Sequence, residues 1–252
     1  MIALVSIAGL GLFLWPFLGL GLPPEVPAVA VTLAAVASLA LIEAGTRRLD
    51  SGRLALLAAL AAIDAALRLA LVNGLGGFSP IFFLVILAGY EFGPSYGFLV
   101  GSFSLLVSAL VTGGVGPWLP YETFALGWVG LSSGVAGAIV RRVRPARRGW
   151  LPNRLDLAVL VIVAVVTGFA YGALTDVWGW AAFYRGVDNI GWVPGLPVGD
   201  TLARFGRYYV LTSLTWDAFR AVGDAIAVVA LGTPVLMAFG RLRARLGYEI
   251  VA

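Results

Sequence analysis

The sequence contains no cysteine, no histidine and no lysine, so all 17 of its basic side chains are arginine. Without cysteine there is no disulfide, no thiolate metal site and no thiol nucleophile. Without histidine the chain lacks the commonest metal ligand and the commonest general base, and without lysine it cannot form a Schiff base. These absences argue against haem, retinal and zinc sites and against most hydrolase chemistry. We therefore expect no catalytic residue, no metal and no cofactor.

Charge is also scarce in this chain. Only 12% of the 252 residues are charged, whereas 60% are apolar, and the mean hydropathy is +0.96. A soluble domain normally carries about a quarter charged residues, and a single soluble core cannot hide this much apolar surface. We therefore expect an all-α integral membrane protein whose length suits one compact helical bundle.

Long apolar runs divide the chain into candidate membrane spans. A helix needs about 20 predominantly apolar residues to cross the hydrocarbon core of a bilayer. The first run lacks the basic segment of a signal peptide, so we interpret it as a span. The fourth run is short, and Gly93 and Pro94 end it sharply. The eight predicted spans are residues 2–22, 26–44, 54–72, 81–92, 96–112, 124–140, 155–174 and 208–239.

The arginine residues predict the orientation of these spans. Twelve of the 17 lie at three places: between the second and third spans, between the sixth and seventh, and after the eighth. With eight spans, all three places lie on one side of the membrane, which the positive-inside rule makes cytoplasmic. Both termini are then cytoplasmic, and the long segment 176–207 is external. The net charge of +4 reflects this topology rather than nucleic-acid binding.

The predicted external loops are rich in aromatic, glycine and proline residues, as in NGLGGFSP at 73–80 and GGVGPWLPY at 113–121. One interpretation is an aromatic belt, in which Trp and Tyr lie at headgroup depth. The other is a capped pocket, whose aromatic walls and few polar groups hold a planar or bulky solute. The amount of glycine and proline favours the pocket. Its predicted lining is Asn73, Phe78, Trp118, Tyr121, Glu122, Trp178, Trp180 and Trp192.

Three stretches of the sequence carry a family resemblance. Residues 83–120 read FLVILAGYEFGPSYGFLVGSFSLLVSALVTGGVGPWLP, and residues 125–134 read ALGWVGLSSG. The ILAGYEFGP block, the following FLVG and the GPW turn resemble the substrate-binding S component of energy-coupling factor (ECF) transporters. Residues 211–222, LTSLTWDAFRAV, look like the last helix of an actinobacterial branch of that family. The resemblance extends over about residues 54–246.

The resemblance implies a six-helix membrane core, here residues 53–246, that captures a vitamin or similar micronutrient from outside. It also implies a membrane partner, the T component, and two cytoplasmic ATPase subunits of an ABC importer. This chain has no GxxxxGK[ST] phosphate-binding loop of its own. The large aromatic face suits cobalamin, while riboflavin, thiamin and biotin stay open. Residues 1–46 add an N-terminal transmembrane hairpin that the common family pattern lacks.

Two other function classes compete with this interpretation. A stand-alone secondary transporter would use intramembrane Asp and Arg residues as an ion relay. It predicts an inverted repeat, and no convincing repeat is visible in the sequence. An intramembrane enzyme acting on lipid headgroups is disfavoured by the missing histidine, cysteine and lysine and by the lack of a paired carboxylate motif.

An alanine stripe on the third span is the candidate partner-docking surface. Ala58, Ala62 and Ala66 are spaced four residues apart, and the resemblance assigns such an AxxxA stripe on the first core helix to contact with the T component. Small residues at this spacing let two helices approach closely in lipid. Packing within the chain's own bundle is the alternative.

Charged residues within the predicted spans suggest a network between the first and last core helices. Asp64 and Arg68 lie on one face of the third span, and Asp217 and Arg220 on one face of the eighth. Unpaired charge at the bilayer centre is costly, so these residues should face the bundle interior and pair. Counting about 1.5 Å per residue along two antiparallel helices pairs Arg68 with Asp217 and Asp64 with Arg220. Asp224, nearer the cytoplasmic side, stays solvated or shares Arg220.

Overall fold

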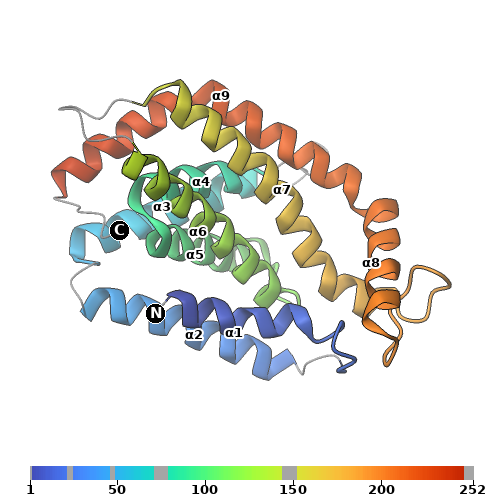
Figure 1. Cartoon of the computed structure of the whole chain (residues 1–252). Helices are drawn as coiled ribbons and strands as arrows, with labels where there is room; N and C mark the ends of the chain where they lie inside the picture. The colour runs from blue at the N-terminus through green and yellow to red at the C-terminus, as the bar shows by residue number, and fades with distance from the viewer. Residues whose placement is uncertain (1, 22–24, 46–48, 71–78, 144–151, 247–252) are drawn as a thin grey trace.

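The computed structural model describes residues 2–21, 25–45, 49–70, 79–143 and 152–246 (Figure 1). Within these ranges every regular element is a helix, apart from an isolated bridge between Arg185 and Trp192. The predicted all-α class is thus confirmed for the described part of the chain. The helices are α1 (Ile2–Leu14), α2 (Glu25–Gly45), α3 (Ser51–Ala70), α4 (Ile81–Phe92), α5 (Pro94–Thr112), α6 (Leu119–Val143), α7 (Arg154–Phe183), α8 (Val198–Thr212) and α9 (Leu214–Arg245).

Five of these helices are long and apolar enough to cross a membrane, namely α2, α5, α6, α7 and α9. Helices α1 and α4 are apolar but only 13 and 12 residues long. Helix α3 has 20 residues but contains Arg53, Asp64 and Arg68. The structure therefore agrees with a membrane helical bundle, while the count of eight spans stays a prediction.

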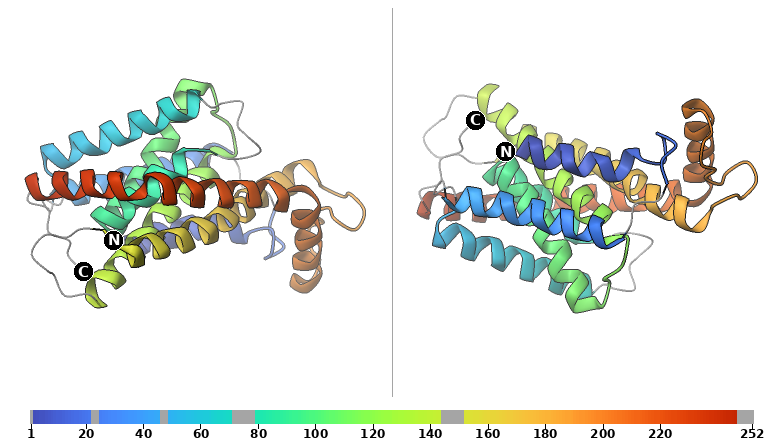
Figure 2. Two further views of the ribbon diagram at one scale, coloured as in Figure 1. Left: turned by 90° about the horizontal axis from the view of Figure 1, so that it is seen from above. Right: turned by 90° about the horizontal axis from the view of Figure 1, so that it is seen from below.

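Two predicted span boundaries are wrong. The run 208–239 is divided at Ser213 into α8 and α9, and α8 lies across the end of α7 and α9 (Figures 1 and 2). At the end of α8, Thr212 Oγ1 donates to the carbonyl oxygen of Tyr208 at 2.8 Å. The run 2–22 also ends early, at Leu14, because Pro16 disfavours helical backbone in the residue before it.

Helices α4, α5 and α6 touch backbone to backbone through glycine. A methyl group added to Gly89 or Gly97 would overlap the carbonyl oxygen of Gly130, and one added to Gly130 would overlap the carbonyl of Gly97. Small residues let helices approach this closely in lipid. Between α4 and α5 the chain turns at Gly93, whose φ of 100° suits glycine, and Pro94 begins α5. The predicted sharp end of the fourth run is therefore confirmed.

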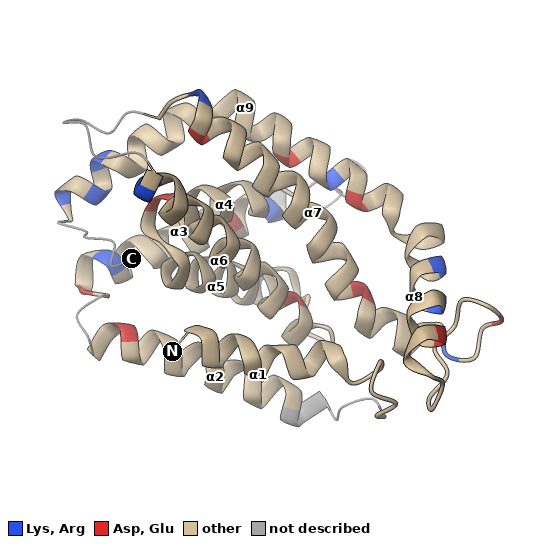
Figure 3. Cartoon of the chain, viewed as in Figure 1, with Lys and Arg blue, Asp and Glu red and all other residues tan. Residues whose placement is uncertain are grey.

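Charged side chains gather where α6 and α9 finish and α3 and α7 begin, here called the arginine-rich end (Figure 3). Arg243 on α9 pairs with the buried Glu91 on α4 at 3.1 Å. Arg141 on α6 donates to the carbonyl oxygen of Tyr90 at 2.6 Å, and the Tyr90 hydroxyl donates to Asp156 on α7 at 2.7 Å. Two of the arginines that predict the topology therefore also join α6 and α9 to α4, and the Tyr90–Asp156 bond adds α7. The opposite end, where α8 lies, is here called the α8 end.

Helices α1 and α2 lie side by side on one side of the bundle (Figure 2) and pack against α6 and α5. Trp128 on α6 donates its indole N–H to Ser6 Oγ at 3.1 Å. The ring of Phe124 fills the space that a side chain at Gly9 would need. Phe13 packs against Trp128 with ring centroids 5.2 Å apart. The N-terminal hairpin is thus packed into the bundle.

Replacing Gly130 with alanine should destabilise the bundle. The added methyl group meets backbone rather than a movable side chain, so the helices must separate, and overpacking of this kind costs about 1–3 kcal/mol or more. Thermal unfolding of the purified protein in detergent should show a lower midpoint. Gly11→Ala is the matched control, because Gly11 is exposed on α1 and an added methyl group has no atom within 4 Å. Equal midpoints for the two variants would contradict the backbone contact.

Candidate functional site

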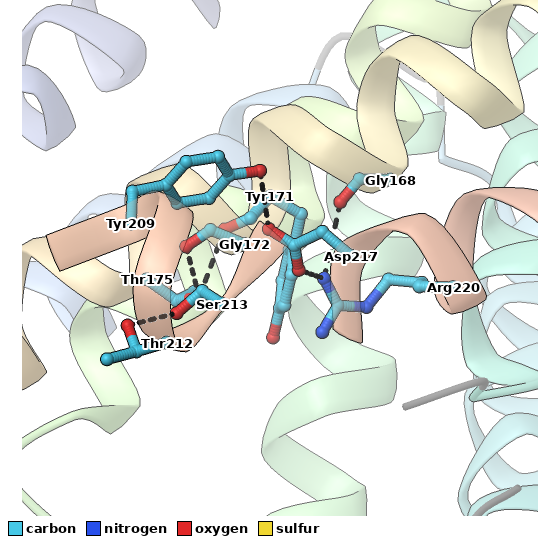
Figure 4. A network of polar contacts seen from close by, with 9 residues as sticks. All are labelled: Gly168, Tyr171, Gly172, Thr175, Tyr209, Thr212, Ser213, Asp217 and Arg220. Carbon is cyan, nitrogen blue, oxygen red and sulfur yellow. Dashed lines mark hydrogen bonds and ion pairs between the residues drawn. The ribbon is translucent and has the colours of Figure 1, made fainter. Parts of the chain in front are cut away.

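A cluster of charged and aromatic side chains lies within the otherwise apolar bundle, towards the α8 end. Arg220 on α9 forms an ion pair with Asp217, one turn earlier on the same helix, and donates to the carbonyl oxygen of Gly168 on α7 at 3.2 Å (Figure 4). Its guanidinium carbon lies 5.2 Å from the ring centroid of Tyr171 and 5.5 Å from that of Phe82. Two aromatic rings and two hydrogen bonds therefore fix the orientation of this arginine.

Asp217 joins three helices at this point. One carboxylate oxygen pairs with Arg220, and the other accepts a hydrogen bond from the Tyr209 hydroxyl on α8 at 2.9 Å. The carboxylate lies directly against Gly172 on α7, where a larger residue would overlap it. Burial and the bond to Asp217 raise the pKa of Tyr209, so its hydroxyl stays protonated and remains a donor. Asp217 is only 2% exposed, so the ion pair is shielded from water. Its hydrogen bonds offset part of the cost of burying the two charges.

Glu122 and Arg68 bring further charge to the same region. Glu122 on α6 is half-buried and interacts electrostatically with Arg68 on α3 and with Arg220. Arg68 donates to Ser108 on α5 at 3.1 Å. Within the described part of the chain, no ion pair joins Glu122 to either arginine. A half-buried carboxylate that forms no ion pair can accept hydrogen bonds from a polar ligand group.

Three of the predicted outer residues form an aromatic wall beside Glu122, made of Trp118, Tyr121 and Trp178. The ring centroid of Trp178 lies 5.8 Å from that of Trp118 and 6.5 Å from that of Tyr121. Trp118 is 36% exposed, whereas Tyr121 and Trp178 are buried. The wall therefore presents an aromatic surface through Trp118, backed by two buried rings. Asn73 and Phe78, predicted for the same site, lie outside the described residues.

The structure does not bring Trp180 and Trp192, predicted for the same pocket lining, to the aromatic wall. Both are buried in a separate cluster with Trp15 and Tyr208. The Trp180 indole donates to the carbonyl oxygen of Ile190 at 2.6 Å. Residues two apart on a helix project about 200° apart, so Trp178 and Trp180 cannot share one face of α7. Trp180 and Trp192 pack the α8 end rather than lining the cluster around Glu122.

The predicted pairs Arg68–Asp217 and Asp64–Arg220 are also not formed. Ser104 on α5 donates to Asp64 at 2.8 Å, Arg68 bonds Ser108, and Asp217 and Arg220 pair with each other. The reason is the arrangement of the helices, because α3 packs on α4 and α5 whereas α9 packs on α4, α7 and α8. The serines at 104 and 108 have the same four-residue spacing as Asp64 and Arg68. That matching spacing is the sequence signal for a bond between α3 and α5.

Asp224 on α9 is fully buried, so the first of its two predicted alternatives, a solvated carboxylate, is wrong. It interacts electrostatically with Arg220, but neither carboxylate oxygen has a hydrogen-bond partner among the described residues. Sequence reasoning also missed Tyr171 and Tyr209, which contact the Asp217–Arg220 pair. For Tyr171, a lone tyrosine within an apolar run is the available signal.

The alanine stripe on α3 faces outwards. Ala58, Ala62 and Ala66 are exposed, whereas Leu57, Leu60, Ala61, Asp64 and Ala65 are buried. Helix α3 therefore turns Asp64 and Arg68 towards α5 and the alanine stripe away from the bundle, on a side that also exposes Leu54, Ile63 and Leu69. In lipid, small residues at this spacing leave room for the close approach of another helix.

Comparison with known proteins gives one match. A family model described as ECF transporter, substrate-specific component, matches residues 52–232, which is more than half of the chain. The match begins at the start of α3 and leaves α1 and α2 outside. No curated protein and no solved structure matches the chain.

Asp217→Asn should destabilise the protein. The substitution leaves Arg220 without its buried counter-charge, and losing one partner of such a pair costs on the order of 3 kcal/mol. Thermal unfolding in detergent should therefore show a clearly lower midpoint than for Asp188→Asn, the control, which removes a carboxylate from an exposed position. The pairing is unimportant for folding if both variants melt at the wild-type temperature.

Proposed function

We propose a function for this chain on the premise that it belongs to the family of substrate-specific components of ECF transporters. Members of this family are integral to the plasma membrane and bind the substrate of an importer, and they are not themselves its ATPases. The function proposed is capture of a vitamin or related micronutrient from outside, followed by delivery to the partner subunits. The observation that carries it is the half-buried Glu122, which interacts electrostatically with Arg68 and Arg220 and lies one turn after Trp118 of the aromatic wall.

The proposal includes an orientation of eight spans with both termini in the cytoplasm. The arginine-rich end then faces the cytoplasm, as the positive-inside rule requires. The α8 end, with the aromatic wall, faces outwards, where a solute arrives. The amphipathic helix α8 carries Arg204 and Arg207 and lies across the bundle (Figure 1), which suits a position at the outer membrane surface.

The polar and aromatic groups define the kind of solute that fits. Arg68 and Arg220 offer guanidinium donors to carbonyl, carboxylate or phosphate groups, while Glu122 accepts from an amide or amine. Trp118 supplies a face for a ring. A ring-containing vitamin with both donor and acceptor groups satisfies this combination. Cobalamin fits a large aromatic face, and riboflavin, thiamin and biotin meet the same chemical requirements.

A thermal-stability screen with vitamins should identify the substrate. A ligand that binds only the folded protein raises its melting temperature, by an amount that grows with concentration over Kd. Cobalamin, riboflavin, thiamin and biotin should be tested on the purified chain, and we expect one to raise the midpoint. The vitamin class is wrong if none does so at millimolar concentration.

Trp118→Ala should then weaken binding of that vitamin by about tenfold or more, which is a loss of ~1.4 kcal/mol. Unfolding should change little, because Trp118 is 36% exposed. Titration calorimetry measures the affinity. Trp216→Ala serves as control, since Trp216 is exposed on α9. Equal affinities for both variants would place the ligand away from the aromatic wall.

We further propose that α3 docks on a membrane T component, which carries two cytoplasmic ATPases. The exposed Ala58, Ala62 and Ala66 support this, because small residues permit close helix contact in lipid. Ala62→Leu should abolish co-purification with the T component and leave vitamin binding intact. Ala37→Leu, at an exposed alanine of α2, should assemble normally. Normal assembly of Ala62→Leu would move the docking surface elsewhere.

The alternative is a stand-alone secondary transporter, and the observation that favours it is Asp224. A fully buried carboxylate without a hydrogen-bond partner among the described residues resembles the proton-relay groups of such transporters. Uptake by the chain expressed without T component and ATPases would establish this alternative, whereas co-purification with an ATPase would establish the first.

A further inference from the structure

The turn that follows α1 reaches into the α8 end of the bundle, although α1 and α2 lie outside the family match. Trp15 is 3% exposed there. Its indole N–H donates to the Tyr121 hydroxyl on α6 at 3.2 Å, in a buried hydrogen bond. An indole this large, buried with its one donor satisfied, is a specific contact rather than a surface anchor.

The same tryptophan contacts the segment that joins α7 to α8. Residues 184–197 are here called the outer cap. The ring centroid of Trp15 lies 5.2 Å from that of Trp192 in the outer cap, with the rings edge to face. Trp192 in turn donates its indole N–H to the carbonyl oxygen of Pro16 at 3.3 Å. Residues 15 and 16 therefore bind the outer cap through one ring contact and one buried hydrogen bond.

The rest of the outer cap is held by α7 and α8. Trp180 donates to the carbonyl oxygen of Ile190 at 2.6 Å, and Arg204 and Arg207 donate to those of Gly191 and Asn189 at 3.3 and 3.2 Å. Residues 185–189 are exposed. Trp192 is thus one buried anchor of the outer cap, and Trp15 is a ring against which it packs.

A continuous series of contacts leads from the outer cap to the aromatic wall. Trp192 contacts Trp15, Trp15 bonds Tyr121, and Tyr121 packs against Trp178. Trp178 is the ring that backs Trp118. Phe17, in the same turn, packs against Trp180 and Phe205, on α7 and α8, at 6.1 and 5.7 Å.

We propose that Trp15 is a positioning residue, which holds the outer cap in place and fixes Tyr121 in the aromatic wall. The N-terminal hairpin then limits movement of the outer cap. Its expected consequence, slower escape of a captured solute, rests on the proposed function. The placement of the outer cap is a property of the ligand-free protein, so it can be tested without a solute.

Attachment of α1 to the bundle does not depend on Trp15. The Trp128–Ser6 hydrogen bond, the Phe13–Trp128 ring contact and the fit of Phe124 against Gly9 all hold α1 on α6 nearer the arginine-rich end. A variant of Trp15 therefore separates the effect on the outer cap from loss of the hairpin.

Hydrogen exchange of the ligand-free full-length protein in detergent tests the role. Trp15→Phe keeps a ring but removes part of the buried side chain, including the indole N–H that bonds Tyr121. We expect amide exchange within residues 184–197 to rise by about two- to tenfold, the ratio that corresponds to one hydrogen bond. Exchange within α6 and α9 should not change. Tyr121→Phe should also raise exchange there. The double variant should give no further rise, because both substitutions remove the same Trp15–Tyr121 hydrogen bond.

Trp128→Phe is the matched control, since it also removes an indole bond between α1 and α6, away from the outer cap. It should leave exchange in residues 184–197 as in wild type. Trp15→Ala should raise it further than Trp15→Phe, because it also removes the ring that contacts Trp192. Wild-type exchange in Trp15→Phe, or an equal rise in Trp128→Phe, would overturn the proposal. The outcome does not depend on whether any vitamin binds, so failure of the proposed function is recognised separately in the vitamin screen.

Discussion

Three helices, α4, α5 and α6, touch backbone to backbone at Gly89, Gly97 and Gly130, and the positions of the other helices follow from this contact. Lipid supplies no hydrophobic drive between helices, so association depends on close van der Waals contact and on interhelical hydrogen bonds. Glycine allows the close van der Waals contact. Helices α3, α7 and α9 pack on α4, α5 and α6, and the N-terminal hairpin packs on α6.

Polar side chains provide the interhelical hydrogen bonds and ion pairs. Asp64 and Arg68 bond two serines of α5, Asp217 joins α7, α8 and α9, and Glu91 pairs with Arg243 at the arginine-rich end. Most of these bonds satisfy charge that would otherwise be costly in a membrane. Glu122 and Asp224 are different, because neither forms an ion pair among the described residues.

At the α8 end, the N-terminal hairpin, which lies outside the family match, packs against helices of the matched region. The chain leaves α1 with a tryptophan and a phenylalanine, and both enter aromatic clusters built by α6, α7 and α8. Tyr121 is shared between the hairpin and the aromatic wall. A change in the hairpin can therefore reach the site through one hydrogen bond, without any contact between the hairpin and a solute.

The sequence by itself determined the membrane class, the helical content and the break at Gly93 and Pro94, because apolar runs and backbone restrictions act locally. The motifs around residues 83–120 also identified the family that the comparison supports. Only the tertiary structure decided that α8 separates from α9, that Trp178 and Trp180 point to different clusters, and that Arg68 bonds Ser108 rather than Asp217. The choice of partner depends on which helices are neighbours. That is set by the glycine contacts between α4, α5 and α6, which spacing along one chain does not reveal.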